Sequence, residues 1–583
     1  MKTVAIVGAR LNSSRLPRKH LLDLAGQALI QRVVTRLETC ENIDTIVLAT
    51  TNDKFNKDLI DWANNNITCY AYTGDVNNLL GRVDYVVKKE QASYVIYICG
   101  DCPLIEPKYI DHALSSLKKY SSYDKVNLHP NIKSLHEGVD IYTRSGWDTL
   151  VTNSQSEMAK EHIGFGHKES PCLRTLYIKD CYDFTRVHHR LSVDTTADYN
   201  FMKIIYQRWF SENASETIVD LAWVQQQILK DKLLVVTNSH VTQKQADRHY
   251  ARISLYCHAS KLIGLGNLKR CSLMAQSLQE NLGYGTTIHV HGTPFECNWL
   301  DQINVVWYED IENLYDNINQ KNSGLFIVDF NPDHLDSHTL VSKIKTANKN
   351  DDIKIIAIDR LTCLLDYCDV LLIPSFHSKL DHPKINIGWK NYFFDKPLYV
   401  DPPIKNQVCI LTGGSDALGY GKHLADILEQ SVPSDYRIVW VQGPYADKPI
   451  LNKNSRISIL YNNRNLQSII SESKIIVSTY GLSFFESLAS GNITLLLPSQ
   501  EILNEDEYNA LEHHKCCLLS ADIVTFKRNL ASVFNDALNL EPIKNKARSL
   551  LNEADGCKIL CEITEGLLNQ KRYVNTEKSI IPS

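Results

Sequence analysis

Short apolar segments, each followed by polar residues and then by a helical pattern, are the feature that most restricts the fold of this chain. The first covers residues 4–7 and is followed by Gly8; the next two cover residues 45–50 and 94–98. Between the first two, apolar residues recur at helical spacing through residues 30–37. Strands that alternate with helices predict an α/β fold with a parallel sheet, in which ligands bind at the carboxyl ends of the strands.

The chain has 583 residues, which is too many for one hydrophobic core. We expect a first domain over residues 1–237, a linker over 238–250, and two further α/β lobes over 251–403 and 404–583. The linker is inferred from a polar stretch, and the division between the lobes from Pro402-Pro403.

The composition is that of a globular protein, with 44% hydrophobic and 22% charged residues. A net charge of -5 offers no basic surface for nucleic acid, and no apolar run is long enough to span a membrane. We therefore expect a cytoplasmic protein with reduced cysteines. Cys99 and Cys102 have metal-ligand spacing, but no second pair nearby completes a zinc site.

The loop over residues 8–19 follows the first apolar run and carries Arg10, Arg15 and Lys19. Gly8 lets the backbone approach a ligand closely. Arginine offers planar pairs of donors to phosphate, and lysine offers a mobile point charge. A triphosphate is therefore a reasonable ligand, although the spacing is neither that of a Walker A loop nor that of a dinucleotide fingerprint. The alternative interpretation of the spacing alone is a solvated basic turn.

The pattern Ala-Arg-x-x-Ser-x-Arg-Leu-Pro-x-Lys over residues 9–19, with Leu-x-x-Leu-x-Gly over 21–26, resembles the opening of the sugar cytidylyltransferases. Within that family, the spore-coat polysaccharide branch is the most similar. A Gly-Asp-x-Pro turn at 100–103 and a Val-Asp-Thr-x-x-Asp-Tyr block at 193–199 also match. The resemblance implies a Rossmann-like nucleotidyltransferase domain that uses CTP and Mg²⁺ and that pairs as a homodimer.

The resemblance also implies roles for individual residues. The implied catalytic residues are Arg10, Arg15, Lys19 and Asp101, and the implied metal ligands are Asp101 and Asp194. The implied nucleotide-binding residues are Gly8, Ala9, Arg10, Ser13, Arg15, Lys19, Thr50, Gly81, Arg82 and Gly100. The implied acceptor-side residues are His136, Glu137, Asp140 and His162, the last of which is equally well explained as structural. We expect residues 191–194 to form a strand that ends in Asp194, and Asp198 to lie early in the following helix, where negative charge is favoured.

The second half of the chain repeats the α/β alternation. We expect strands at residues 325–328, 355–358, 370–373, 408–411, 437–441 and 475–477. Two such halves facing across a cleft are the glycosyltransferase-B architecture. Ile-Gly-x-Gly-x-x-x-Arg-Cys over 263–271, Gly-Gly-Ser-Asp over 413–416, and the pair Ser483 and Glu486 resemble a hydrolase of pseudaminic acid synthesis that releases UDP from a UDP-linked amino sugar, and its spore-coat relatives.

This second resemblance implies a cleft that binds a nucleotide-sugar. The implied ligand-binding residues are Gly264, Gly266, Asn267, Arg270, Gly413, Gly414, Ser415, Ser483 and Glu486. The hydrolase has its base histidine where this chain has Asn267, and an amide takes no proton near neutral pH. Loss of a general base typically costs about 10²–10⁴-fold in rate. His258, His289 and His291 are alternative bases, although lone histidines on strands are more often structural.

Together these features predict an enzyme of surface-glycan precursor synthesis. Its first domain would transfer CMP from CTP to an acidic sugar of the nonulosonate or octulosonate type, or to a sugar or polyol phosphate. The two later lobes are open to three interpretations: a nucleotide-sugar-binding module, an active UDP-sugar hydrolase, or a glycosyltransferase. Either of the last two would make the protein bifunctional.

Overall fold

The computed structural model describes residues 1–132, 134–184, 187–244, 250–295, 299–300, 302–316, 323–333, 336–347, 353–375, 380–395, 404–461, 466–499, 503–535 and 539–577. The chain divides into two compact units, residues 1–250 with 280–283 and residues 251–279 with 284–583. Part of the predicted linker, residues 245–249, and the predicted lobe boundary at 403/404 with Pro402-Pro403 fall on or beside segments outside the described residues.

The first unit contains a seven-stranded sheet in the order β5-β4-β1-β6-β8-β7-β9. Its strands are β1 (Thr3–Gly8), β4 (Thr45–Thr51), β5 (Thr68–Tyr72), β6 (Tyr94–Cys99), β7 (Lys125–Leu128), β8 (Val139–Thr143) and β9 (Thr175–Ile178), with a small hairpin of β2 (Asp23–Leu24) and β3 (Gln27–Ala28) outside the sheet. The predicted parallel sheet is confirmed for β5, β4, β1 and β6, but β8 runs antiparallel to β6 and β7. No helix separates β7 from β8 in the described chain, and a connection without a helix suits antiparallel neighbours.

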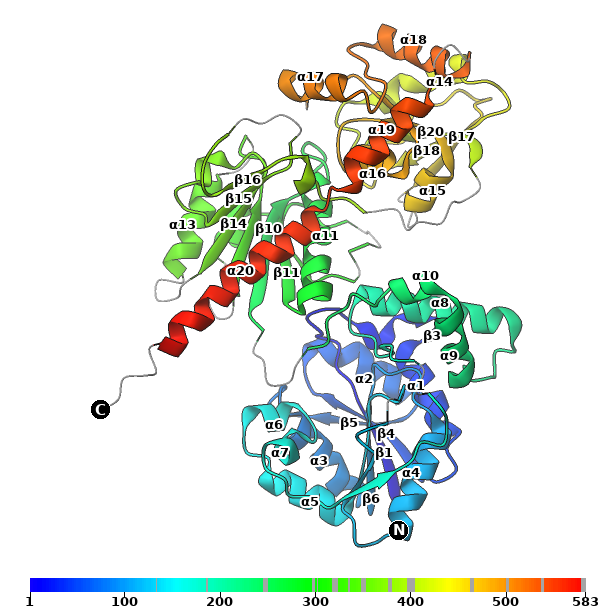
Figure 1. The fold of residues 1–583 in the computed structure, drawn as a ribbon, viewed down its shortest axis with the longest axis vertical. Helices are drawn as coiled ribbons and strands as arrows, with labels where there is room; N and C mark the ends of the chain where they lie inside the picture. The colour runs from blue at the N-terminus through cyan, green and yellow to red at the C-terminus, as the bar shows by residue number, and fades with distance from the viewer. Residues whose placement is uncertain are drawn as a thin grey trace. The chain divides into compact units, whose positions relative to one another are not determined.

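Helices cover both faces of this sheet (Figure 1). The helices of the unit are α1 (Leu29–Glu38), α2 (Lys57–Asn64), α3 (Leu79–Glu90), α4 (Pro107–Lys119), α5 (Arg144–Asn153), α6 (Glu157–Glu161), α7 (Phe165–Glu169), α8 (Thr196–Glu212), α9 (Leu221–Lys230) and α10 (Lys232–Val236). Buried side chains of α3 and α5 form one core with the sheet, and those of α1, α4 and α8 form the core on the opposite face. The α/β layering expected from the sequence is therefore present.

The strand order places β1 between β4 and β6, where the direction of winding reverses. At such a switch point the loops after neighbouring strands separate to opposite faces and leave a crevice for ligands. Gly8 at the end of β1 pairs with Cys99 at the end of β6, and the Gly100 amide donates to the Gly8 carbonyl at 3.0 Å. The loop after Gly8 and the turn at Gly100 therefore start side by side.

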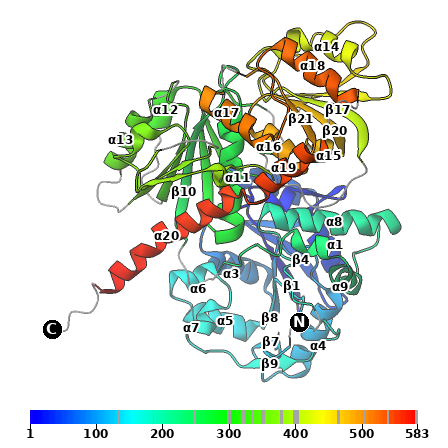
Figure 2. The same ribbon diagram turned by 45° about the horizontal axis from the view of Figure 1, so that its top comes forward.

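The second unit contains two separate parallel sheets, visible in Figures 1 and 2. The first, in the order β12-β11-β10-β13-β14-β15-β16, consists of β10 (Arg252–His258), β11 (Gly285–His291), β12 (Val305–Tyr308), β13 (Ser323–Asp329), β14 (Lys354–Ile358), β15 (Val370–Ile373) and β16 (Ile385–Ile387). The second, in the order β19-β18-β17-β20-β21, consists of β17 (Lys405–Leu411), β18 (Arg437–Gln442), β19 (Ile457–Tyr461), β20 (Ser473–Ser478) and β21 (Ile493–Leu496). Both sheets have a central switch point, so the expected pair of α/β lobes is confirmed.

The helices of the second unit flank these sheets and join the lobes. They are α11 (Gly266–Leu282), α12 (Ile311–Asp316), α13 (Ser337–Ala347), α14 (Leu424–Ser431), α15 (Leu466–Glu472), α16 (Leu482–Ser490), α17 (Glu505–His514), α18 (Ile523–Phe534), α19 (Glu541–Asn552) and α20 (Gly556–Glu577). Helix α19 contacts α16 in the second lobe, whereas α20 contacts β13 in the first. The Cys561 thiol of α20 lies 3.3 Å from the Ser277 hydroxyl of α11, so helix α20 returns to the first lobe.

Candidate functional site

The Lys19 ammonium group joins two carboxylates that are far apart in the sequence. Its Nζ donates to Asp101 Oδ2 at 2.5 Å and to Asp194 Oδ1 at 2.8 Å. Lys19 is only 6% exposed. Burial disfavours its charged form, but the two carboxylates outweigh burial and raise the pKa of Lys19 above its ordinary value. Lys19 is therefore held as a cation between two acids.

Asp194 receives positive charge from three sides. Its Oδ1 accepts from Lys19, and its Oδ2 lies 3.0 Å from an Arg15 nitrogen and also accepts from Arg190. Burial alone would raise the pKa of this carboxyl, but Lys19, Arg15 and Arg190 outweigh it and hold the pKa well below its ordinary value. Arg15 is 8% exposed, so the charges of the cluster are mostly shielded from water.

The segment that carries Asp194 is an extended loop, so the predicted strand over residues 191–194 is wrong. The Val193 amide donates to the Asp101 carbonyl at 2.8 Å, and the Ser192 amide donates to the Glu137 carboxylate at 2.8 Å. The Ser192 amide is thus satisfied by a side-chain carboxylate and not by the backbone of a neighbouring strand. The bond to the Asp101 carbonyl brings Asp194 to the turn after β6, as the metal hypothesis requires.

Asp198 has a structural position in the first turn of α8, as predicted. Its carboxylate and the Thr195 hydroxyl form a capping box at the helix start. The same carboxylate accepts from Arg190 Nε at 3.1 Å and from Asn238 at 3.0 Å, and the residue is 1% exposed. Asp198 therefore anchors Arg190, which in turn contacts Asp194.

The remaining predicted nucleotide residues surround the carboxyl ends of β1 and β4. A Cβ added to Gly8 would lie 2.8 Å from the Tyr97 ring, so the glycine is required for packing against that ring. Arg10 donates to the Val76 carbonyl at 2.9 Å. The backbone amide of Gly81 is bonded to the Asn78 side chain, which caps α3. Ala9 and Thr50 are buried, Ser13 is half-buried and accepts from the Leu16 amide at 3.3 Å, and Gly100 is buried against Gly8.

Arg82 on α3 is a buried cation without an acceptor. It is 4% exposed, and its Nε and Nη1 have no hydrogen-bond partner among the described residues. Burial lowers the pKa of this guanidinium to about 10. The nearby Arg10 also lowers the pKa, whereas Tyr97 and Asp53 raise it. A guanidinium carries donors and no acceptor, so an unpaired buried one favours a ligand that offers acceptor atoms.

The four predicted acceptor-side residues lie in different environments. His136 stacks on Tyr109 with ring centroids 4.1 Å apart, and its Nε2 is 3.0 Å from an Asp180 oxygen, so it has structural partners. Burial raises the pKa of Glu137 and of Asp140. Glu137 contacts the loop that carries Asp194, Asp140 lies on β8 opposite Tyr97, and His162 is half-buried at the end of α6.

Asp101 and Asp194 suit a divalent cation of the magnesium type. Both bond one ammonium group, so their nearest oxygens are at most about 5 Å apart. Magnesium is usually held by one or two carboxylates together with phosphate oxygens and water. Within the described ranges no group of three or more histidine, cysteine, aspartate or glutamate side chains is arranged to hold a metal. The two carboxylates therefore fit a metal that is also coordinated by phosphate oxygens, rather than one coordinated by protein side chains alone.

In the second unit, the two glycine-rich loops predicted to bind ligand meet each other. A Cβ added to Gly414 would lie 2.7 Å from Leu265 Cγ, and one added to Gly264 would lie 3.5 Å from Ser415 Oγ. Gly264 and Gly413 both have positive φ, +87° and +83°, a conformation that glycine adopts without strain. Helix α11 begins at Gly266, and a Cβ there would meet no atom within 4 Å.

Asn267 and Arg270 belong to a hydrogen-bonded network on α11. Asn267 Nδ2 donates to Asp329 Oδ1 at 2.7 Å, and Arg270 makes two bonds to the same carboxylate, at 2.6 and 2.7 Å. Arg270 also donates to Asp359 at 3.0 Å, and Asp329 is fully buried. The Asn267 amide is thus held as a donor to a carboxylate.

The three alternative histidines have neighbours that explain them without catalysis. The Asn331 amide donates to His258 Nε2 at 3.0 Å, and His258 is fully buried. His289 Nδ1 is 3.1 Å from the Tyr308 hydroxyl, and burial lowers its pKa to about 4. Burial also lowers the pKa of His291, which has a hydrogen bond to the backbone of Glu309.

Glu486 is a buried acid at the junction of the two lobes. It lies on α16, four residues after the helix begins at Leu482 and three after the half-buried Ser483, and is 3% exposed. Burial, with the neighbouring Asp395 carboxylate, raises its pKa to about 8, and Lys269 partly opposes this effect. Lys269 itself bonds Asp395 at 2.8 Å. Glu486 is therefore protonated near neutral pH.

Sequence reasoning missed Arg190, Lys269 and Asp395. Arg190 lies four residues before Asp194 and just ahead of the matching block at 193–199, so its closeness in the sequence was a signal that could have been used. Lys269 lies inside the 263–271 motif, but its partner Asp395 is 126 residues away. Local sequence patterns do not predict an ion pair between residues so far apart in the chain.

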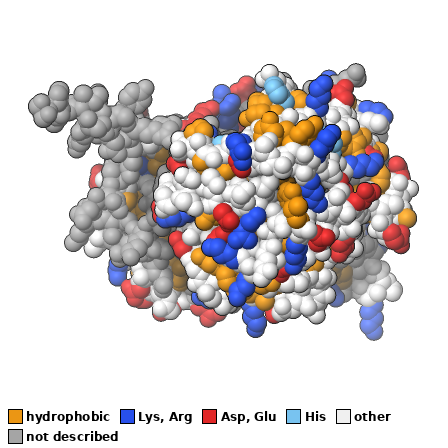
Figure 3. All heavy atoms as spheres, turned by 90° about the horizontal axis from the view of Figure 1, so that it is seen from below, with side chains coloured by type: hydrophobic (Ala, Val, Ile, Leu, Met, Phe, Trp, Pro, Cys, Tyr) orange, Lys and Arg blue, Asp and Glu red, His pale blue; other side chains and the backbone are white. Residues whose placement is uncertain are grey.

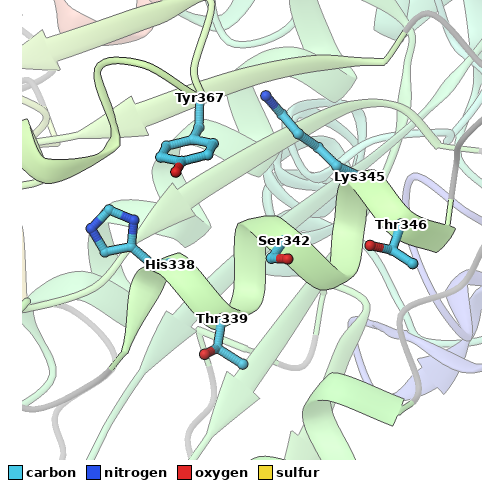
Figure 4. A pocket seen from close by; sticks show the side chains of 6 residues that line it. All are labelled: His338, Thr339, Ser342, Lys345, Thr346 and Tyr367. Carbon is cyan, nitrogen blue, oxygen red and sulfur yellow. The ribbon is translucent and has the colours of Figure 1, made fainter.

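The surface outside these sites has mixed charge. Figure 3 shows lysine, arginine, aspartate and glutamate side chains interspersed over the face that it draws. A cavity of about 510 Å³ lies along α13, lined by His338, Thr339, Ser342, Lys345, Thr346 and Tyr367 (Figure 4). None of these is a predicted site residue. No helix in the described part of the chain has the length and apolar character needed to cross a bilayer.

Comparison with known proteins identifies the first unit. A family model described as Cytidylyltransferase matches residues 4–231. The 3-deoxy-manno-octulosonate cytidylyltransferase of Geobacter sulfurreducens is 28% identical over 137 residues, 24% of this chain and 54% of that protein. The spore coat polysaccharide biosynthesis protein SpsF of Bacillus subtilis is 24% identical over 208 residues, 35% of this chain and 85% of that protein. The chain thus spans about half the length of the octulosonate enzyme that it matches.

Solved structures align with both parts of the chain. A cytidylyltransferase from Leptospira borgpetersenii covers 42% of this chain and 100% of its own, with 20% identity and a TM-score of 0.36. MurG of Acinetobacter baumannii covers 54% of this chain and 99% of its own, with 14% identity and a TM-score of 0.36. By its sequence match and its residue pattern, the segment 4–231 is a domain of the cytidylyltransferase family, a family of nucleotidyltransferases.

Proposed function

We propose that the first unit transfers CMP from CTP to an oxygen of an acidic sugar of the octulosonate or nonulosonate type, or of a sugar or polyol phosphate. The observation that carries the proposal is the meeting of Lys19, Arg15, Asp101 and Asp194 at the ligand-binding edge of a cytidylyltransferase-family sheet. The family match and the printed activity of the octulosonate enzyme support CTP as the nucleotide.

In this reaction the acceptor oxygen attacks the α-phosphorus of CTP in line, the bond from that phosphorus to the oxygen that bridges to the β-phosphate breaks, and pyrophosphate leaves. The proton of a hydroxyl acceptor passes to solvent water. Arg10, Arg15 and Lys19 offset the negative charge that grows on pyrophosphate. Asp101 and Asp194 would hold Mg²⁺, which supplies further charge neutralisation to the phosphates when it is bound. Phosphoryl transfer depends mainly on positioning and electrostatics, so no side-chain nucleophile is needed.

Pyrophosphate release from CTP tests the proposal. The full chain is incubated with CTP, Mg²⁺ and a panel of acidic sugars and polyol phosphates, and pyrophosphate is followed. We expect release with one acceptor class and its loss in Asp101→Asn. Asp58→Asn is the matched control, because Asp58 also pairs with a cation of the loop, Arg18, but is exposed. Release that is independent of Asp101 would contradict the assigned site.

We propose further that the second unit binds a nucleotide-sugar between its two lobes without hydrolysing it. The meeting of the loops at Gly264 and Gly414, the open space at Gly266 and the buried Glu486 support binding. The bond from Asn267 to Asp329 argues against a base at that position. Calorimetry of the full chain with UDP tests the proposal, since Glu486→Ala should weaken binding and Asp101→Asn should not. Release of UDP from a UDP-sugar by the wild-type protein would contradict it.

A further inference from the structure

The carboxylates assigned to the metal are already occupied by cations of the protein. Both oxygens of Asp194 are engaged, Oδ1 by Lys19 and Oδ2 by Arg15 and Arg190, and Asp101 Oδ2 is bonded to Lys19. A divalent ion that bridged Asp101 Oδ2 and Asp194 Oδ1 would have to take the position of the Lys19 ammonium, which contacts both atoms, whereas Asp101 Oδ1 faces the Cys102 thiol at 3.6 Å.

We propose that Lys19 is a built-in counter-ion of this site, so that a divalent cation binds there only after a nucleoside triphosphate has drawn Lys19 away. This inference rests on the proposed function for the identity of the nucleotide. It assigns Lys19 two alternating partners, the carboxylate pair in the nucleotide-free protein and the phosphates in the complex.

Lys19 is better able to move than Arg190. Arg190 is fixed by Asp198, whose two oxygens both lie 3.1 Å from its Nε. Lys19 is a point charge on a flexible stem, and its two acceptors are the carboxylates themselves. Phosphate oxygens that accept from Lys19 would replace those acceptors, and they would leave Asp101 and one oxygen of Asp194 open to a metal.

The arrangement makes metal binding and nucleotide binding mutually dependent. Without nucleotide, a divalent ion meets Lys19, Arg15 and Arg190 at close range, and like charges at this distance repel strongly in a partly buried site. With nucleotide, the added negative charge removes that repulsion. By linkage, the bound metal strengthens nucleotide binding by the same factor as the nucleotide strengthens metal binding.

Manganese binding to the nucleotide-free full chain tests the inference, with electron paramagnetic resonance of free Mn²⁺ as the readout. We expect weak binding by the wild type and binding tighter by about tenfold or more in Lys19→Met, a coupling within the usual range between linked sites. Arg18→Met is the matched control, because Arg18 is adjacent in sequence but pairs with the exposed Asp58, and it should bind as the wild type does. Adding Asp101→Asn to Lys19→Met should abolish the gain.

The inference is overturned if the nucleotide-free wild type binds Mn²⁺ as tightly as Lys19→Met, or if the gain survives loss of Asp101. Thermal unfolding gives a second readout, since Mn²⁺ should raise the melting temperature of Lys19→Met and not that of the wild type. Lys19→Gln, which removes the charge and keeps a donor, serves if the methionine variant fails to fold. Pyrophosphate release is measured separately, so a protein that turns over CTP yet binds Mn²⁺ tightly alone would refute this inference and leave the proposed function standing.

Discussion

The buried Glu486 predicts a pH dependence of stability that belongs to the second unit. Its pKa rises from 4.5 to about 8 because of burial and the nearby Asp395 carboxylate. Below about pH 4.5 the carboxyl is protonated in both the folded and the unfolded chain, and its contribution is complete. Between about pH 4.5 and about pH 8 the carboxyl is protonated in the folded chain and ionised in the unfolded chain, so the free energy of unfolding falls as the pH rises.

The size of the effect follows from the two pKa values. One pKa unit corresponds to about 1.4 kcal/mol, so the full loss by about pH 8 is at most about 5 kcal/mol. The proximity of Lys269, which favours the ionised form, reduces this maximum. Glu486→Gln keeps the shape and cannot ionise, and it should therefore lose this pH dependence. Relative to the wild type, the variant should become more stable as the pH rises.

Scanning calorimetry of the full chain from about pH 5 to about pH 9 measures the effect. The melting temperature of the second unit in Glu486→Gln, minus that in the wild type, should increase with pH by about 2–4 °C per kcal/mol or less. Glu505→Gln is the control, because Glu505 is exposed in the first turn of α17 and should give a constant difference. A constant difference for Glu486→Gln as well would refute the protonated, buried carboxyl.

Three further predictions concern single side chains. Asp194→Asn should lower pyrophosphate release from CTP by about 10²-fold or more, whereas Asp198→Asn should retain most of that release and lower the free energy of unfolding by about 1–3 kcal/mol, because it removes one of the two carboxylates that pair with the buried Arg190. Equal loss of pyrophosphate release in the two variants would contradict this division. Arg82→Met should weaken CTP binding by about tenfold or more in calorimetry, because a buried guanidinium without an acceptor favours a ligand that supplies one, and unchanged affinity would show that Arg82 faces no ligand. Asn267→His should not gain UDP release from a UDP-sugar, because the position faces the buried Asp329 carboxylate rather than open solvent, and a clear gain would show an attacking water already in line.

The sequence by itself determined several of the strands, the loop over residues 8–19 and the family of the first unit. The apolar runs at residues 45–50, 94–98 and 370–373 correspond to β4, β6 and β15 within a residue. These segments are buried on both faces, so their apolar run alone specifies them. The loop motif with Arg15 and Lys19 was also identified from the sequence, because a long pattern of residue types can be recognised without knowing which residues are in contact.

Only the tertiary structure decided how the charged residues are paired. The sequence suggested that Lys19 faces a ligand, whereas the fold places it between Asp101 and Asp194, the second of them 175 residues away. The strand predicted to end at Asp194 is a loop, in which the Ser192 amide bonds the Glu137 carboxylate rather than the backbone of a neighbouring strand. Hydrophobic periodicity encodes burial one element at a time, but an ion pair depends on which loops the sheet order brings to one edge, and that order is a property of the packed chain.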